Sequence, residues 1–283
     1  MTVDLQGLVT IADGFAFTEC PRWHQGWLNF SDMYGGAVFR LNETGVVEEV
    51  VREEARPGGL GFLPDGSLLF AAMDASRVMR LKDGAVTLHA DLTSIAPGGI
   101  NDMIVSPEGR CYVAHFTHDL PPPSKPVIFI DEHGQTSETT DLLKVANGMI
   151  LPTDGRRLIV AESAGGRLSV MDLGDGGRPK NRTTFAELPP GHYADGICGD
   201  DTGGVWVTCC RGPGVVRVEQ GGAVTHRVPI DDGRFAYASA LGGADGRTLY
   251  VCTAGRYEHG MMAEKRDARI EAIRVPFAGS GIP

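Results

Sequence analysis

Oxygen-bearing side chains recur along this chain at positions that precede a glycine by seven or eight residues. They are Glu19, Asn101 with its neighbour Asp102, Asn147 and Asp195. Carboxylate and carboxamide oxygens are the ligands that hard divalent cations prefer, and the absence of histidine from the set disfavours zinc. A carboxylate such as Glu19, set among apolar residues in FTECPRW, is costly to bury unless it is paired or binds a metal. The pattern therefore predicts a divalent cation site, with a water-filled polar tunnel as the alternative.

These side chains belong to a repeated unit. Each unit has a short apolar run, a turn that contains glycine, and a β-rich run, which together indicate a hairpin. The turn glycines follow one another at intervals of 40, 43, 46, 48 and 43 residues: Gly26, Gly66, Gly109, Gly155, Gly203 and Gly246. Further short strand candidates lie between the hairpins, for example at 37–42 and 78–83, and no stretch has a sustained helical period.

Six units of about four strands predict an all-β fold, a six-bladed β-propeller of four-stranded antiparallel blades around a central tunnel that contains the metal. We expect one domain over residues 1–283. A β-sandwich or an irregular barrel would not explain the repeat. The apolar run at 268–277 is expected to complete a blade with the N-terminal run at 8–14, which closes the ring and hides the sheet edges.

Equivalent positions in successive blades form a ring around the propeller axis. Counting back from each turn glycine completes the ring with Gly59 and Ser239, so four of the six blades direct a carboxylate or carboxamide at one mouth of the tunnel. We expect Glu19 to lie on the innermost strand of its blade, with its side chain in the tunnel and its neighbours packed between blades. Phe235 and Tyr237 precede the sixth position and are candidates for an apolar wall.

The composition limits the classes of partner. The 283 residues carry a formal net charge of -10, which argues against nucleic acid and anionic membranes as default partners and favours a small-molecule substrate. The N-terminus has neither a basic start nor a long apolar run, so a cytoplasmic location is expected. The six cysteines form no CxxC pair and are interpreted as reduced, buried thiols. The sequence does not indicate an oligomeric state.

Five segments together resemble the regucalcin/gluconolactonase family of six-bladed propellers over nearly the whole chain. They are FTECPRW, NDMIVSPEGRCYVA, NGMILPTDGRRLIVAES, YADGICGDDTGGVWV and LYVCTAG. The resemblance implies one divalent metal ion, with Glu19, Asn147 and Asp195 as its ligands. It also implies that Asn101 contacts the substrate. Ca²⁺ is favoured because it tolerates irregular oxygen ligation, and Mg²⁺, Mn²⁺, Fe²⁺ and Zn²⁺ remain open.

The resemblance implies hydrolysis of a lactone, because most relatives open sugar lactones. Others are phosphofluoridate hydrolases or luciferin-regenerating enzymes of similar architecture. The hypothesis is that the metal polarises the lactone carbonyl while Asp195 acts as the base that activates water. Asn101 would orient the substrate, and Tyr193 is a candidate for the pocket lining. Two alternatives stay open: another metal-dependent reaction, such as phosphotriester hydrolysis or the isomerisation or hydration of a non-sugar carbonyl compound, and a non-catalytic calcium-binding propeller.

The chain departs from the family pattern near Asn101. Sugar-lactone relatives often carry an arginine where this chain has Gly99, and a glycine where it has Met103. These two changes favour a less polar substrate than an aldonolactone. The nearby loop HFTHDLPPPSKP is distinctive and predicts a stiff rim, because polyproline is extended and rigid. Its side chains are candidates for substrate recognition or proton transfer, namely His115, His118 and Asp119.

Overall fold

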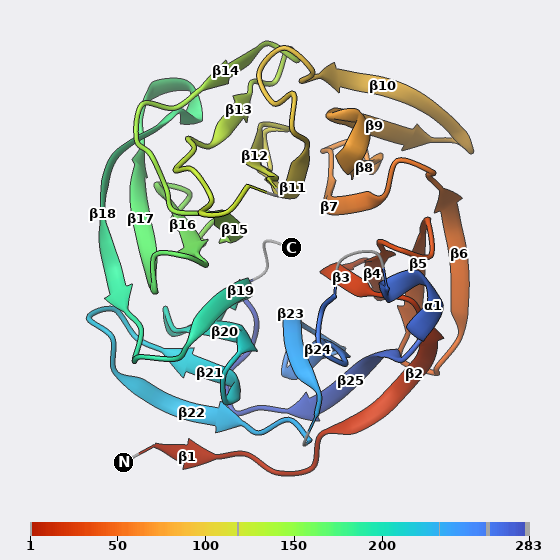
Figure 1. The fold of residues 1–283 in the computed structure, drawn as a ribbon, viewed down its shortest axis with the longest axis vertical. Coiled ribbons are helices and arrows are strands. Elements are labelled where there is room, and N and C mark those ends of the chain that lie inside the picture. Colours follow the sequence, from red (N-terminus) through yellow and green to blue (C-terminus); the bar gives the residue numbers. More distant parts are fainter. Residues whose placement is uncertain (1, 118, 232, 259–260, 281–283) are drawn as a thin grey trace.

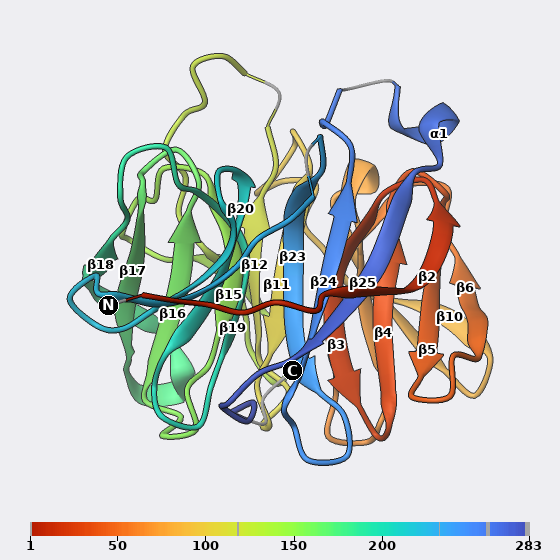
Figure 2. The same ribbon diagram turned by 90° about the horizontal axis from the view of Figure 1, so that it is seen from below.

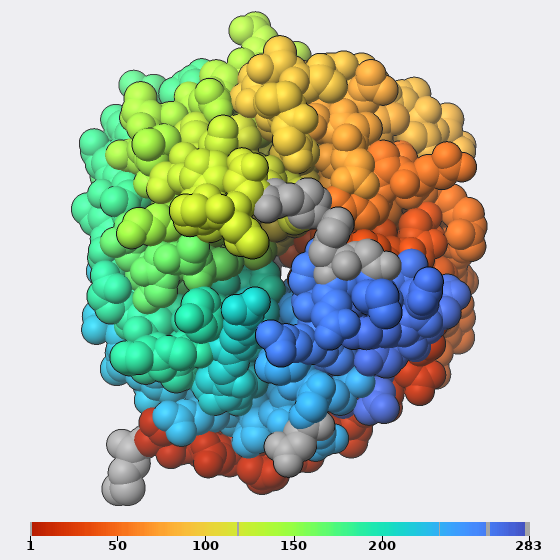
Figure 3. Space-filling view, viewed as in Figure 1, coloured from red at the N-terminus to blue at the C-terminus, as the bar shows by residue number. Residues whose placement is uncertain are grey.

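The structure is a computed structural model that describes residues 2–117, 119–231, 233–258 and 261–280. Six sheets surround a central axis like the blades of a propeller (Figure 1), which confirms the predicted fold. Every blade contains four antiparallel strands that run in order from the axis to the periphery. Figure 3 shows the axis as a narrow opening in the middle of the ring.

The first three blades are built from consecutive strands. Blade 1 consists of β3 (Thr18–His24), β4 (Trp27–Asp32), β5 (Ala37–Asn42) and β6 (Val47–Arg52). Blade 2 consists of β7 (Pro57–Phe62), β8 (Leu68–Ala72), β9 (Arg77–Lys82) and β10 (Ala85–Asp91). Blade 3 consists of β11 (Ile100–Val105), β12 (Cys111–His115), β13 (Ile128–Ile130) and β14 (Thr136–Glu138).

The other three blades complete the ring. Blade 4 consists of β15 (Ala146–Ile150), β16 (Arg157–Glu162), β17 (Arg167–Leu173) and β18 (Pro179–Glu187). Blade 5 consists of β19 (Tyr193–Gly199), β20 (Val205–Arg211), β21 (Gly214–Val218) and β22 (Val224–Val228). Blade 6 consists of β23 (Phe235–Gly242), β24 (Thr248–Ala254), β25 (Ala268–Arg274) and β2 (Val9–Phe15).

Both ends of the chain contribute to closure. Strand β2 pairs antiparallel with β25, so one outer strand from the N-terminus completes three strands from the C-terminal part, as the sequence predicted. In Figure 1 the two strands lie side by side. Strand β1 (Val3–Asp4) pairs in parallel with β22 and adds a fifth strand to blade 5, a contact that the sequence did not predict.

Apolar side chains fill the spaces between neighbouring blades. Leu60 and Phe70 of blade 2 pack against Cys20 and Val38 of blade 1, and all four are at most 2% exposed. Because each strand alternates its side chains between two faces, both faces of a blade are buried against its neighbours. This packing holds the inner strands rigidly around the axis.

Helical structure is limited to short turns. The α-helix α1 (Met262–Lys265) and the 3₁₀ turns η1 (Met73–Ala75) and η2 (Asp175–Gly177) are the helical elements among the described residues. In the side view of Figure 2, α1 projects from one face of the ring and the inner hairpin turns lie at the other face. Within the described part of the chain, no helix has the length and apolarity needed to cross a bilayer.

Candidate metal centre and active site

The six innermost strands share an irregularity near the ring positions. In every blade, the pairing between the innermost strand and its neighbour shifts there. The shifts lie between Glu19 and Arg22, Pro57 and Leu60, Ile100 and Met103, Ala146 and Met149, Ala194 and Ile197, and Ala236 and Ala238. Such bulges leave residues unpaired and redirect their side chains. The unpaired residues include Asn101, Asn147 and Asp195, whereas Glu19 pairs with Ser31 directly before the shift in its blade.

Asn147 and Asp195 come together from blades 4 and 5. The amide nitrogen Nδ2 of Asn147 donates a hydrogen bond to Oδ1 of Asp195, and it lies 3.4 Å from the hydroxyl of Ser163. Asp195 is 8% exposed. Each residue is the first unpaired residue of its bulge, which explains why two positions 48 residues apart meet.

Glu19 lies near this pair and is also 8% exposed. The backbone N–H of Cys20 donates to Oε2 of Glu19 at 3.0 Å. Burial, and next the negative charge of Asp195, raise the pKa of Glu19 well above its usual range. The two carboxylates therefore interact through space, and the sequence correctly placed them in one neighbourhood.

The two buried carboxylates have no cationic partner in an ion pair among the described residues. Burial raises the pKa of Asp195 to about 7, and the charge of Asp102 adds to this effect. Burial and the repulsion between two negative charges favour the protonated forms of these carboxylates, whereas a bound cation would favour the ionised form of both. Glu19, Asp195 and the carboxamide oxygen of Asn147 thus fit a hard divalent cation. No three or more His, Cys, Asp and Glu side chains gather into a metal cluster in the described ranges.

Asn101 and Asp102 play different structural parts. Asp102 forms a buried ion pair in which Nη2 of Arg22 lies 2.7 Å from its Oδ1, and the Met103 N–H donates to the same oxygen at 2.7 Å. The side chain of Asn101 is partly exposed and makes no hydrogen bond with another described residue. Its carboxamide is therefore available to a bound molecule.

Blade 2 contributes no polar side chain to the ring because its backbone lies too close to blade 3. A Cβ atom on Gly59 would be 2.1 Å from the backbone N of Met103 and 2.6 Å from the carbonyl carbon of Asp102. Only glycine fits such a close approach. The glycine that counting placed in the ring is thus required by packing.

In blade 6, the bulge does not coincide with the ring position that counting from the turn glycine predicts. Its pairing shift falls at Tyr237, two residues before Ser239. Ser239 is 2% exposed, and its hydroxyl lies 3.6 Å from Sγ of Cys198 beside a cavity of ≈ 150 Å³. Ser239 therefore lies two residues beyond the bulge and lines this cavity with residues of blades 1, 3, 4 and 5, because the bulge in β23 is shorter than the others.

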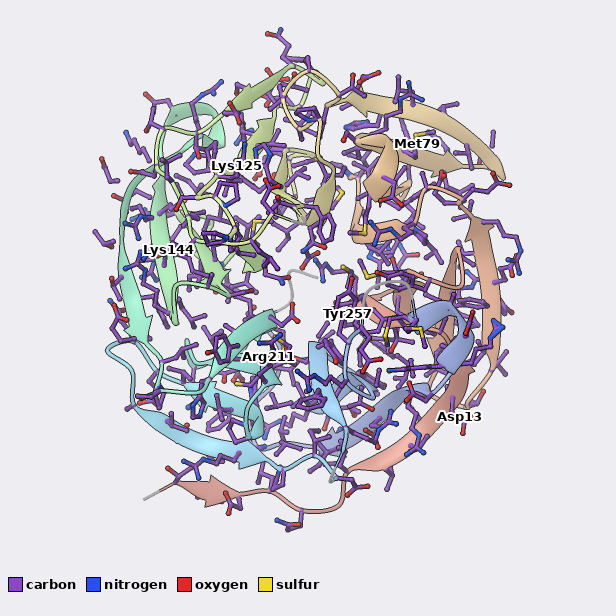
Figure 4. The ribbon with its side chains drawn as sticks, in the orientation of Figure 1. Asp13, Met79, Lys125, Lys144, Arg211 and Tyr257 are labelled. Carbon is purple, nitrogen blue, oxygen red and sulfur yellow. The ribbon has the colours of Figure 1, made fainter. Side chains whose placement is uncertain are left out.

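An aromatic network lies close to the two carboxylates. The ring of Tyr237 is 4.7 Å from that of Phe17, and burial raises the pKa of Tyr237 with further contributions from the charges of Asp195 and Glu19. The Tyr237 hydroxyl accepts a hydrogen bond from the N–H of Tyr257 at 2.9 Å. In Figure 4, Tyr257 and Arg211 lie towards the centre of the ring, whereas Asp13 lies at its edge. The expected apolar wall thus includes Tyr237.

The wall continues into blades 1 and 2. The hydroxyl groups of Tyr257 and Tyr34 lie 2.7 Å apart, and Nη1 of Arg56 donates to Tyr34 at 3.2 Å. The Arg56 guanidinium also lies over the ring of Phe116, 5.3 Å from its centroid. Sequence reasoning missed Tyr34, Tyr257 and Arg56, since they come from connections between strands that carry no repeat signal.

The predicted rim residues are dispersed. His115 is buried, and its Nε2 lies 3.1 Å from Oε1 of Glu138 on the outermost strand of blade 3, so it does not contact the ring carboxylates. Asp119 is exposed, and its N–H bonds to the Thr117 hydroxyl. His118 lies outside the described residues. Tyr193 is 46% exposed at the start of β19, with the Arg211 guanidinium 6.0 Å from its ring centroid.

Known proteins share both the sequence pattern and the fold. The chain is 26% identical to regucalcin of Xenopus laevis over 263 residues, which cover 86% of this chain and 85% of that protein. It is 28% identical to pentonolactonase XacC of Haloferax volcanii over 275 residues, which cover 94% and 92%. The structure of the calcium-binding protein regucalcin from Agrobacterium tumefaciens superimposes with a TM-score of 0.80 at 18% identity, covering 99% and 97%.

The family assignment follows from a match over most of the chain. Residues 17–255 match the model of the family described as the SMP-30/gluconolactonase/LRE-like region. This range begins two residues before Glu19 and includes the inner strands of all six blades. The chain therefore belongs to the SMP-30/gluconolactonase/LRE-like family.

Proposed function

We propose that this protein is a metal-dependent hydrolase that opens a lactone ring at the mouth of the tunnel. The observation that carries the proposal is the meeting of Glu19 and Asp195, two buried carboxylates without a cationic partner in an ion pair among the described residues, beside the carboxamide of Asn147. Support also comes from the family and from its relative named pentonolactonase. A location in the cytoplasm, and one domain over residues 1–283, are part of the same proposal.

Glu19, Asn147 and Asp195 would hold the cation, with Ca²⁺ favoured because all three donors are oxygen atoms. A bound divalent cation supplies a positive charge that polarises the lactone carbonyl and favours negative charge on its oxygen. The Agrobacterium relative is described as a calcium-binding protein, which supports the same choice. Mg²⁺, Mn²⁺, Fe²⁺ and Zn²⁺ are the competing ions.

The protein's own residues would perform the proton transfer and the positioning. Asp195 would take a proton from the attacking water as that water adds to the carbonyl carbon. The bond between the carbonyl carbon and the ring oxygen would then break, and Asp195 would pass the proton it took from water to the ring oxygen, which gives the hydroxy acid. Asn101 would orient the lactone through its carboxamide, and the Tyr237 wall would exclude bulk water on one side.

The wall favours a lactone with an apolar substituent over a polyhydroxylated sugar lactone. Phe17, Tyr237 and Tyr257 pack together close to the carboxylates, with ring centroids 4.7 and 5.4 Å apart for the pairs that involve Phe17, and Tyr257 is the exposed member at 37%. The packing of an apolar substrate group against aromatic rings is favourable, whereas the ring faces offer few hydrogen bonds to the hydroxyl groups of a sugar. The same surface would suit a phosphotriester, the second candidate substrate class.

The test is hydrolysis by chelator-treated protein that is resupplied with one divalent ion at a time. Aldonolactones, alkyl-substituted lactones and a phosphotriester are assayed with a pH indicator that detects the released acid. We expect metal-dependent opening of a lactone, with loss of activity in Asp195→Asn and Glu19→Gln. Asp13→Asn, on the outer strand of blade 6, is the matched control that keeps activity. An Asp195→Asn variant that binds metal and hydrolyses at the normal rate would refute the role of the base.

A calcium-binding propeller without catalysis makes a different prediction. In that case Glu19→Gln would lower the melting temperature in the presence of the metal, while no compound in the panel would be hydrolysed by the unaltered protein. The thermal measurement and the activity measurement on the same samples therefore separate a structural ion from a catalytic one.

A further inference from the structure

Two charged residues interrupt the repeat at positions where the other blades are apolar or small. The first residue that pairs after the shift is apolar in five blades: Leu60, Met103, Met149, Ile197 and Ala238. In blade 1 it is Arg22. The last unpaired residue of the bulge is proline or glycine in blades 1, 2, 4 and 5, whereas in blade 3 it is Asp102.

The two exceptional residues contact each other although their blades are not neighbours. Nη2 of Arg22 lies 2.7 Å from Oδ1 of Asp102 and also donates to the carbonyl of Met103 at 2.7 Å. Blade 2 lies between them and carries Gly59, where a side chain would collide with the backbone at Met103. Arg22 thus reaches past blade 2 to contact blade 3.

Stability does not explain this pair. Its side chains are 7% and 6% exposed, and Nε of Arg22 is buried with no hydrogen-bond partner among the described residues. A buried ion pair loses most of its attraction to desolvation, and apolar residues of similar size are often as stable. The five other blades use apolar residues at the position of Arg22, so packing alone does not require a charge there.

The pair changes the number of carboxylates that the tunnel offers to a cation. The charge of a third carboxylate, Asp102, acts on Glu19 and on Asp195, although the three side chains do not gather into a metal cluster among the described residues. Arg22 engages the third through Oδ1, which also accepts the Met103 N–H. With Arg22 counted, the group has a net charge of about -2 when it is ionised, which a divalent ion balances.

We propose that Arg22 is a positioning residue that holds Asp102 outside the ligand set and so restricts the cation site to two carboxylates and a divalent ion. This inference rests on the proposed metal site. It assigns Arg22 a part in ion selectivity, which is separate from the hydrolytic step and can be measured without a substrate.

The experiment compares Ca²⁺ and Tb³⁺ binding to chelator-treated protein by isothermal titration calorimetry. The variants are Arg22→Met, which installs the residue that blades 3 and 4 carry at this position, and the double variant Arg22→Met/Asp102→Asn. Loss of the guanidinium frees a third carboxylate, so the preference for Tb³⁺ over Ca²⁺ should rise at least about tenfold in the single variant. The double variant should return to the ratio of the unaltered protein.

The outcomes separate this inference from the metal site itself. If the unaltered protein binds neither ion, the proposed metal site fails and this inference falls with it. If the unaltered protein binds Ca²⁺ and Arg22→Met keeps the same Tb³⁺ preference, only the role of Arg22 is refuted. Should Arg22→Met not fold, the Asp102→Asn variant alone decides. In this variant the guanidinium of Arg22 is unpaired and should weaken binding of both ions at least about tenfold. Unchanged affinity would refute the inference.

Discussion

Replacing Asp195 by asparagine should stabilise the metal-free protein, by an amount that grows with pH. Burial raises the pKa of Asp195 from an ordinary value of 3.8 to about 7. The folded protein therefore keeps this proton between about pH 4 and 7, where the unfolded chain has lost it, and the free energy of unfolding falls as pH rises through this range. A shift of about three units corresponds to about 4 kcal/mol in total, an upper estimate for a carboxyl in a tunnel.

The assay is thermal and urea unfolding of chelator-treated protein at a series of pH values from 4 to 8. We expect Asp195→Asn to match the unaltered protein near pH 4 and to exceed it by up to about 4 kcal/mol at pH 8. For a chain of this size that difference corresponds to roughly 8 °C in melting temperature. Saturating Ca²⁺ should reverse the order, because the cation favours the ionised carboxylate that the variant lacks.

Asp200 provides a control of opposite sign. Asp200 is also buried, and burial alone would raise its pKa. The hydrogen bonds from Arg217, Thr202 and Gly204, together with the charge of Arg217, outweigh that effect and lower the pKa. Nε of Arg217 lies 2.6 Å from Oδ2 of Asp200. Asp200→Asn should therefore destabilise the protein at pH 7, with or without metal. If the effect of Asp195→Asn is independent of pH, or destabilising in metal-free protein at pH 8, the reasoning about the ring carboxylates is wrong.

Three further predictions concern the scaffold and the mouth. Gly59→Ala should lower the free energy of unfolding by more than about 2 kcal/mol in a urea titration, because its Cβ would lie 2.1 Å from the backbone N of Met103. Deletion of residues 1–15 removes β2 from blade 6 and should prevent cooperative thermal unfolding, whereas deletion of residues 1–5 should leave it intact. Tyr257→Phe removes a hydroxyl contact at the mouth and should raise KM for an accepted lactone by up to roughly fivefold, with little change in melting temperature.

The architecture could be predicted because its signals are local. Each hairpin has its own turn glycine and its own apolar strands, so six repeats are visible without any long-range information. The pairing of β2 with β25 was also predictable, since an unpaired strand at each end of a propeller needs a partner. The meeting of Asn147 with Asp195 followed from the same periodicity.

Contacts that depend on how far a side chain of one blade reaches past the next blade could not be predicted from the sequence. Arg22 and Asp102 are 80 positions apart and come from blades that are not neighbours, while Gly59 of the blade between them lets the backbone at Met103 approach closely. Counting from the turns also assumed equal bulges, which fails in β23, where the shift falls at Tyr237. His115 was expected at the rim, but its side chain contacts Glu138 on β14. No sequence motif indicates how close β14 lies to β12. The roles of the predicted site residues stay predictions.

The shared construction of blade 6 has a consequence for how the chain folds. Strand β2 leaves the ribosome before the strands of blades 1 to 5, yet its partner β25 begins only at Ala268. A contact between such distant segments forms late, because closing a long loop is entropically unfavourable. Blades 1 to 5 can each assemble from consecutive strands during synthesis. Until β25 is made, the backbone N–H and C=O groups of β2 have no strand partner. The slow step in refolding should therefore be the joining of the two ends, and early nascent chains are the species most exposed to aggregation.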